Sequence, residues 1–248
     1  DANQCVIGGL DNYKTTNGGA SWTKISVWVG NSGNYVHADQ HTSIWYDNGN
    51  KFLFGSDGGI FYSADGGITA VNRNVGLRLK EFYSCAIHPT LTNYFLAGAQ
   101  DNGTHQFNGA GLTSSIEITG GDGAYVDIDQ DQPQYQFGAY IYNQYRRSTN
   151  GGTSWSSINF SSSAGEFINP FDYDDLGNRM YCCYSAGQYL RWENPQIGNT
   201  TTTVSMPLFN GGLAEAISVS PYTANRVYFG ATKGRVMQVD MAEATSPT

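Results

Sequence analysis

Histidine and aspartate alternate in the segment "VHADQH", where His37, Asp39 and His41 are spaced two residues apart. On an extended strand, alternate side chains point to the same face, so these three could coordinate a metal ion. The spacing supplies no fourth ligand, and a tetrahedral metal site needs four. The sequence therefore favours a structural role, in which Asp39 and His41 bond the backbones of neighbouring loops.

Three aspartates offer a second kind of chemistry, namely Asp57 in "GSDGG", Asp101 in "GAQDNGTH" and Asp122 in "GGDGAY". Two carboxyl groups about 5 to 10 Å apart could cleave a glycosidic bond. Aspartate before glycine is also an ordinary tight-turn pair, however. Asp57, Asp101 and Asp122 are therefore candidate catalytic residues for which turn formation is the competing interpretation.

A short turn motif recurs along the chain as "TTNGGASW", "SADGGITA" and "STNGGTSW". Its short polar side chains can bond turn amides, and its second glycine supplies a backbone angle that other residues resist. The tryptophan of the first and third copies is expected to pack between strands, and Ala70 replaces it in the second. The residues with this structural role are Thr15, Asn17, Gly19, Trp22, Ser63, Asp65, Gly67, Ser148, Asn150, Gly152 and Trp155.

A longer repeat is marked by apolar runs that end in small residues. The runs begin at Cys5, Phe52, Tyr94, Tyr135, Met180 and Val227. A period of about 40 to 50 residues with strand-like units indicates a β-propeller, in which each repeat forms one four-stranded blade with strands A to D. The sequence thus predicts a single all-β domain with repeats near 1–36, 37–80, 81–120, 121–163, 164–210 and 211–248.

The turn motif resembles the Asp-box of the BNR repeats found in sialidases, sortilin-type propellers and xyloglucanases. In those families the box is structural, so the resemblance implies a fold and not a reaction. The phrases "VHADQH", "AQDNGT" and "GGDGAY" also resemble segments of large bacterial secreted proteins with such propellers. This resemblance implies a secreted or cell-surface location. The three-arginine cluster of sialidases has no match here, which disfavours sialic acid cleavage.

The first and last repeats are shorter than the others. The first begins at what should be strand B, and the last ends after "GRVMQVD", which should be strand C. About six blades are therefore visible, and we expect a partial ring to which a longer chain could add a seventh blade.

Propeller topology sorts the polar residues by face. The D-to-A and B-to-C loops emerge on one face, and the A-to-B turns, which contain His88, Asp129 and Asp174 as ordinary turn residues, emerge on the other. Tyr140, Gln188 and Lys233 occupy later positions on the first face. The ligand-binding face is predicted to contain His37, Asp39, His41, Asp57, Gln100, Asp101, Asn102, Asp122, Tyr142 and Asn143.

Composition excludes several classes of protein. The 248 residues include 13 Lys and Arg against 21 Asp and Glu, and the net charge of -8 repels nucleic acid. No apolar run reaches the roughly 20 residues of a membrane helix. The four cysteines lack C-x-x-C spacing, so zinc is not expected. Adjacent Cys182 and Cys183 should face opposite ways, and buried free thiols are favoured over a disulfide that would involve Cys85.

These observations favour an extracellular or cell-surface module for recognition or structural assembly, which binds glycan or protein on its acidic loop face without catalysis. The alternative is a glycoside hydrolase of the xyloglucanase-like group that uses two of Asp39, Asp57, Asp101 and Asp122. No cofactor is specified, although the acidic loops could hold a cation such as calcium. The expected partners are a glycan, a protein or further parts of a longer chain.

Overall fold

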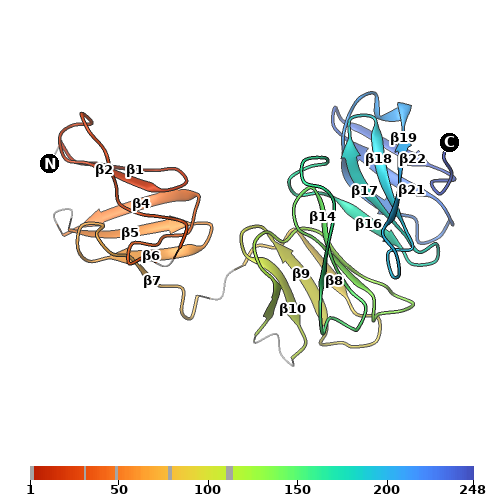
Figure 1. Cartoon of the computed structure of the whole chain (residues 1–248), viewed down its shortest axis with the longest axis horizontal. Coiled ribbons are helices and arrows are strands. Elements are labelled where there is room, and N and C mark those ends of the chain that lie inside the picture. Colours follow the sequence, from red (N-terminus) through yellow and green to blue (C-terminus); the bar gives the residue numbers. More distant parts are fainter. Residues whose placement is uncertain (1–2, 31, 48–49, 78–79, 110–113) are drawn as a thin grey trace. The chain divides into compact units, whose positions relative to one another are not determined.

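A computed structural model describes residues 3–30, 32–47, 50–77, 80–109 and 114–248, and within these ranges the regular structure consists of strands β1 to β22 and a single-turn 3-10 helix, η2 (Pro207–Phe209). The chain forms two compact units, residues 1–79 and 80–248, which are described separately (Figure 1). In the described ranges, no helix has the length and apolar character needed to cross a membrane. The predicted all-β class is confirmed.

Residues 1–79 form two antiparallel sheets. The first contains β1 (Cys5–Gly8), β2 (Asn12–Thr15) and β3 (Thr23–Lys24), and the second contains β4 (Gln40–Tyr46), β5 (Lys51–Ser56), β6 (Gly59–Ser63) and β7 (Val71–Asn72). Burial alternates along β5, where Phe52 and Phe54 are buried and Leu53 between them is not. This alternation places the two phenylalanines on one face, where they pack with Ile25 and Phe61 in the core of the unit.

Residues 80–248 form four antiparallel sheets, whose strands follow one another in sequence order. The first contains β8 (Ser84–Ile87), β9 (Phe95–Ala99), β10 (Gly103–Phe107) and β11 (Ile116–Thr119). The second contains β12 (Val126–Ile128), β13 (Gln136–Ala139), β14 (Asn143–Ser148) and β15 (Ser156–Ser161). The third contains β16 (Phe171–Asp174), β17 (Arg179–Ser185), β18 (Gln188–Glu193) and β19 (Thr200–Ser205). The fourth contains β20 (Ala214–Val219), β21 (Val227–Ala231) and β22 (Arg235–Val239).

Each of the six sequence repeats contains one of these sheets. The repeats at 37–80, 81–120, 121–163 and 164–210 each carry four strands, and those at 1–36 and 211–248 each carry three. The three copies of the turn motif join β2 to β3, β6 to β7 and β14 to β15, which are the last two strands of their sheets.

The sheet β16–β19 is buried on both faces, as its cysteines show. Cys182 packs in a core cluster with Trp192, whereas Cys183 packs in another with Phe229, so the prediction that adjacent cysteines face opposite ways is confirmed. All four thiols are free, but Cys5 and Cys85 are exposed, contrary to the expectation of burial. Burial raises the pKa of Cys182 to about 12 and that of Cys183 to about 11, which keeps both as unreactive thiols at neutral pH.

The recurring turn has one hydrogen-bond pattern in all three copies. In the third copy, Ser148 Oγ accepts from the amide of Gly152 (2.9 Å), and Asn150 Oδ1 accepts from the amide of Ser154 (3.0 Å). Thr15 with Gly19 (3.0 Å) and Ser63 with Gly67 (2.9 Å) make the equivalent bonds. The three glycines have φ between 80° and 95°, a region that favours glycine. The tryptophans differ, because Trp155 is partly buried and Trp22 is 40% exposed, so Trp22 does not pack between strands.

Replacing Ser148 with alanine should lower the free energy of unfolding by about 2 kcal/mol, because the buried amide of Gly152 would lose its acceptor. Ser154→Ala is a matched control, since the Ser154 hydroxyl bonds Asn150 at an exposed position (2.9 Å) and should contribute less than about 0.5 kcal/mol. Urea unfolding of both variants measures the difference. Equal effects would show that the turn is not held by the serine at its start.

Candidate functional site

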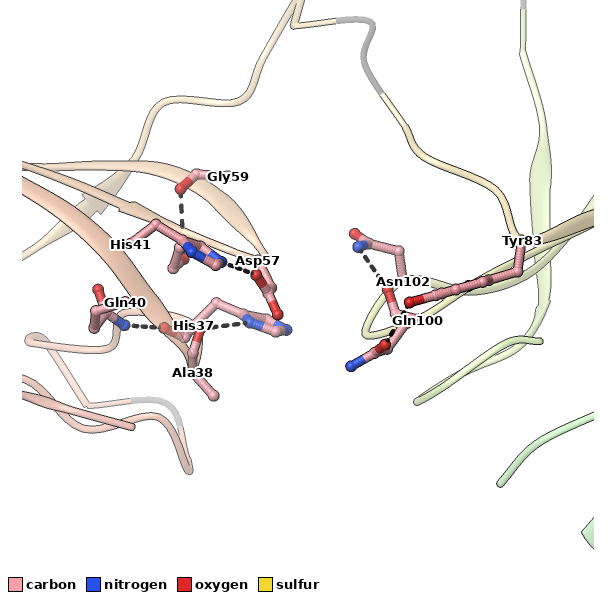
Figure 2. A network of polar contacts seen from close by, with 10 residues as sticks. His37, Ala38, Gln40, His41, Asp57, Gly59, Tyr83, Gln100 and Asn102 are labelled. Atoms are coloured by element: carbon pink, nitrogen blue, oxygen red, sulfur yellow. Dashed lines mark hydrogen bonds and ion pairs between the residues drawn. The ribbon is translucent and has the colours of Figure 1, made fainter. Parts of the chain in front are cut away.

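The predicted loop residues of the first unit contact one another. His41 Nε2 contacts Asp57 Oδ1, and the amide of Asp57 donates to the carbonyl of Asp39 (3.3 Å). Figure 2 shows the His41 and Asp57 side chains pointing toward one another. The hydrogen bond and charge of Asp57 raise the pKa of His41. The pair links the start of β4 to the turn between β5 and β6.

The backbone does not form one continuous strand through the three residues proposed as metal ligands. Asp39 has φ of 59°, in the left-handed region, so the chain is not extended between His37 and His41. His41 lies in β4 while His37 lies before it, and His37 Nδ1 contacts the carbonyl of Ala38 (3.3 Å). The alternation on which the metal hypothesis depended is therefore wrong, because it requires a continuous strand.

In the second unit, the loop residues also contact one another. Asp122 Oδ1 accepts from the amide of Asp101 (3.1 Å), which holds the loop before β12 against the turn between β9 and β10. The side chain of Gln100 accepts from the Tyr83 hydroxyl (3.0 Å), and the backbone carbonyl of Gln100 accepts from the side-chain Nδ2 of Asn102 (3.1 Å) (Figure 2). These contacts fix the shape of the loops.

Asn143 is completely buried, which corrects its assignment to the ligand-binding face. Its side chain donates to the carbonyls of Ala164 (2.8 Å) and Cys183 (3.0 Å) and accepts from the Tyr145 hydroxyl (2.9 Å). A buried amide with these partners stabilises the packing between sheets β12–β15 and β16–β19. The sequence could not distinguish this position from the partly buried turn residue Tyr142 beside it.

The remaining positions of the predicted ligand-binding face lie in turns or beside them, except that Gln188 begins β18. Tyr142 and Lys233 share the left-handed backbone of Asp101, with φ of 51° and 69° at the corresponding turns. Tyr142 also packs edge-on against Phe167. Tyr140 stacks with the guanidinium of Arg146, and Gln188 accepts from Ser185 (2.6 Å).

A different site lies along the first strands of the four sheets of residues 80–248. An open cavity of about 790 Å³ is lined by residues of β8, β12, β16 and β20 and of the turns that follow these strands. We call it the inner-strand cavity. Its acidic residues are Asp127, Asp131, Asp172, Asp174 and Asp175, its aromatic residues are Tyr125, Phe171 and Tyr173, and its described lining contains no Lys, Arg or His. It reaches the A-to-B turns, which lie on the opposite side from the D-to-A and B-to-C loops that were predicted to form the ligand-binding face.

Two carboxylates of the inner-strand cavity connect neighbouring sheets. Asp172 Oδ2 accepts from the amide of Val219 on β20 (2.6 Å), and Asp175 Oδ1 accepts from the amide of Gln130 in the turn after β12 (2.6 Å). Sheet β16–β19 is thereby joined to the sheets on both sides. Asp127 differs, because its Oδ1 accepts from Ile128 on its own strand (2.7 Å).

Burial and mutual repulsion favour protonation of these acids. Burial, followed by the charges of Asp172 and Asp175, raises the pKa of Asp127 well above its ordinary value. Burial also raises the pKa of Asp172, against the opposing effect of the Val219 and Tyr173 amides. Burial raises the pKa of Asp175 to about 6. A glycosidase pair needs environments that push two carboxyl pKa values apart, whereas here all three move upward.

Asp175→Asn should stabilise the protein more at pH 7.5 than at pH 5. An aspartate whose folded pKa exceeds its unfolded value of about 3.9 contributes stability that is complete below that pH and is lost as the pH rises through about 6. The asparagine oxygen can still accept from Gln130 and carries no charge. Thermal unfolding of the variant and the parent at both pH values measures the difference in stability. His105 also titrates, and its lowered pKa changes stability in the opposite direction, but this effect is common to both proteins and cancels in the difference. Exposed Glu215→Gln is the control, and an equal gain at both pH values would contradict the assignment.

The sequence contained a signal for the inner-strand cavity that the loop analysis missed. "AYVDID" and "INPFDYD" each place two aspartates before a turn, with one residue between them. The second aspartate of each does form the turn, because Asp129 accepts from the amide of Gln132 (2.7 Å) and Asp174 from that of Gly177 (2.9 Å). The first aspartates, Asp127 and Asp172, line the cavity.

No protein-family model matches the sequence, and no curated protein matches it. Among solved structures, the chain is similar to an ancestral GH74 enzyme at 21% identity and a TM-score of 0.52, over 96% of this chain and 35% of that one. It is also similar to the extracellular domain of a one-component system of B. thetaiotaomicron at 11% identity and a TM-score of 0.51, over 100% and 35%. The chain thus spans about a third of the length of either. Both are β-propeller proteins, and with the successive antiparallel sheets these similarities show that the chain has the β-propeller fold class.

Proposed function

We propose that the chain is a non-catalytic recognition module of a secreted or cell-surface protein, and that it binds a protein or glycan in the inner-strand cavity. The observation that carries this proposal is the cavity itself, whose volume of about 790 Å³ falls in the range of ligand sites. Its lining combines aromatic faces with carboxyl groups, which suit ligands that present both apolar and polar groups. The similarity to an extracellular domain supports the location.

The absence of catalysis is supported by the direction of the pKa shifts. Asp127, Asp172 and Asp175 all have raised pKa values, so within this group of three the environment moves no carboxyl toward the ionised form that would partner a protonated general acid. The loop acids Asp57 and Asp122 contact His41 and the Asp101 amide, respectively. These contacts favour a structural role for the loops, while the cavity receives the ligand. The net charge of -8 makes nucleic acid an unsuitable ligand.

The test is a search for ligands followed by substitution in the cavity. The 248-residue chain is screened on an array of polysaccharide fragments and against a random displayed peptide library. We expect at least one class of ligand to bind the parent and to bind Asp127→Asn about tenfold more weakly. Glu215→Gln, an exposed change on β20 outside the cavity lining, should leave binding unchanged. Ligands that bind both variants equally would place recognition elsewhere.

A glycoside hydrolase is the second candidate, and one observation favours it. Asp127 has the raised pKa that a general acid requires, in a chain whose fold is similar to that of a GH74 enzyme. Incubation with xyloglucan and other β-glucans, with measurement of reducing ends, tests this candidate. If the parent releases reducing ends and Asp127→Asn does not, the result would support a hydrolase site in the cavity. Release that is lost instead in the asparagine variants of Asp39, Asp57, Asp101 or Asp122 would return the site to the loop face.

A further inference from the structure

We propose that the inner-strand cavity and its apolar rim bind a protein segment that carries a Lys or Arg side chain flanked by apolar residues. The proposal rests on the proposed function and names the partner for that site. Three features carry it, namely the exposed apolar residues at the rim, the aromatic walls and the charge of the lining.

The rim is formed by apolar residues that solvent would otherwise contact. Ile87 at the end of β8 is 67% exposed, and Leu176 in the turn after β16 is 80% exposed, and both line the cavity. Tyr222 is 95% exposed and follows Pro221, another lining residue. Large apolar side chains gathered around a concavity are typical of protein interaction sites, and tyrosine is enriched at their energetic centres.

The charge of the cavity selects the side chain that enters it. Five aspartates line the cavity, and its described lining contains no basic residue. A guanidinium or ammonium group would relieve the repulsion among Asp127, Asp172 and Asp175 and would form charge-assisted hydrogen bonds with them. Charge complementarity therefore favours a basic segment over a neutral glycan.

The lining combines the groups that a basic side chain can use. Lys and Arg have apolar stems that can lie against Ile87 and Leu176 while the charged group reaches the acids. Tyr125, Phe171 and Tyr173 also line the cavity, and aromatic faces attract cations. A bare metal ion would use the carboxylates but would gain nothing from the apolar residues. This mixed lining thus favours an organic cation attached to an apolar segment.

The proposal can be tested with three fluorescent peptide libraries of equal length. Each has apolar residues at the flanking positions and a fixed central residue, which is Lys or Arg in the first, Gln in the second and Glu in the third. Fluorescence anisotropy with the whole chain should show at least tenfold tighter binding of the basic library than of the Gln library, and weaker binding of the Glu library. Raising the salt concentration should reduce the preference.

Substitutions locate the binding. Asp127→Asn and Leu176→Ser should each weaken binding of the basic library about tenfold. The first removes a carboxyl group that a bound cation would favour in its ionised form, and the second removes an apolar rim contact. Ile197→Ser, an 81% exposed change outside the cavity lining, and Glu215→Gln are the matched controls and should leave binding unchanged. Circular dichroism of every variant confirms that it is folded.

The outcomes separate this inference from the function on which it rests. Equal binding of the basic and Gln libraries would overturn the inferred partner class. If no library binds while a glycan does, and Asp127→Asn weakens that glycan, the partner class is wrong and the recognition function stands. If neither peptides nor glycans bind at the cavity, both proposals fail.

Discussion

Trp192→Ala is expected to lower the free energy of unfolding of residues 80–248 by about 4 kcal/mol. Trp192 on β18 has no exposed surface, and its ring contacts those of Phe137, Tyr145 and Phe160, with ring centroids 6.0, 5.8 and 5.0 Å away. Its Nε1 donates to the carbonyl of Gly198 (2.8 Å). Alanine would leave a cavity where aromatic side chains of two sheets meet and would leave the Gly198 carbonyl without this donor.

The measurement is urea unfolding, combined with hydrogen exchange of peptides from residues 80–248 because the chain has two compact units. Tyr222→Ala is the control, since it also deletes an aromatic ring in this unit but at a position that is 95% exposed. The control should change stability by less than about 0.5 kcal/mol. A loss for Trp192→Ala as small as that of the control would mean that the two sheets do not depend on this ring for their packing.

The sequence was sufficient for the fold because its repeats are local signals. Each apolar run and each turn motif specifies a strand or a connection from a few neighbouring residues, as the bond between Ser148 and the Gly152 amide illustrates. The repeat period of about 40 to 50 residues then indicates that each repeat forms one small sheet of about four strands. Small departures, such as exposed Trp22, arise because burial depends on neighbours distant in sequence.

The site was harder to predict because it depends on contacts between repeats. Loop aspartates such as Asp57 and Asp122 stand beside glycines and were plausible site residues, but Asp57 contacts His41 on β4 and Asp122 accepts from the amide of Asp101 in a neighbouring turn. Asp127 and Asp172 stand within ordinary strands, and only the packing of successive sheets brings their charges together. A comparison of equivalent positions in "AYVDID" and "INPFDYD" would have identified them.

The second large effect is expected from Gly98→Ala, because the backbone that leads into β12 passes directly against this residue of β9. A methyl group on Gly98 would overlap the carbonyl oxygen of Ala124 and would lie 2.8 Å from its carbonyl carbon and 2.9 Å from its nitrogen. Backbone atoms cannot rotate away as a flexible side chain can, so the sheets β8–β11 and β12–β15 must separate. We expect a loss of about 3 kcal/mol or more, at the upper end of overpacking effects.

Gly138→Ala is the matched control for this prediction. Gly138 lies on β13, one residue before Ala139, as Gly98 on β9 lies one residue before Ala99. A methyl group there would meet its nearest atom, Thr104 Oγ1, at 3.6 Å, which is ordinary contact, and should change stability by less than about 1 kcal/mol.

Separation of the two sheets should also reach the inner-strand cavity. Ser84 Oγ accepts from the amide of Val126 (3.2 Å), which joins β8 to β12 beside the cavity acids. In Gly98→Ala that amide should exchange with solvent faster, whereas in Gly138→Ala it should keep its protection. If Gly98→Ala is too unstable to purify while Gly138→Ala is soluble, the soluble yields give the same comparison. Equal stability and equal exchange in the two variants would mean that the sheets do not pack this closely at Gly98.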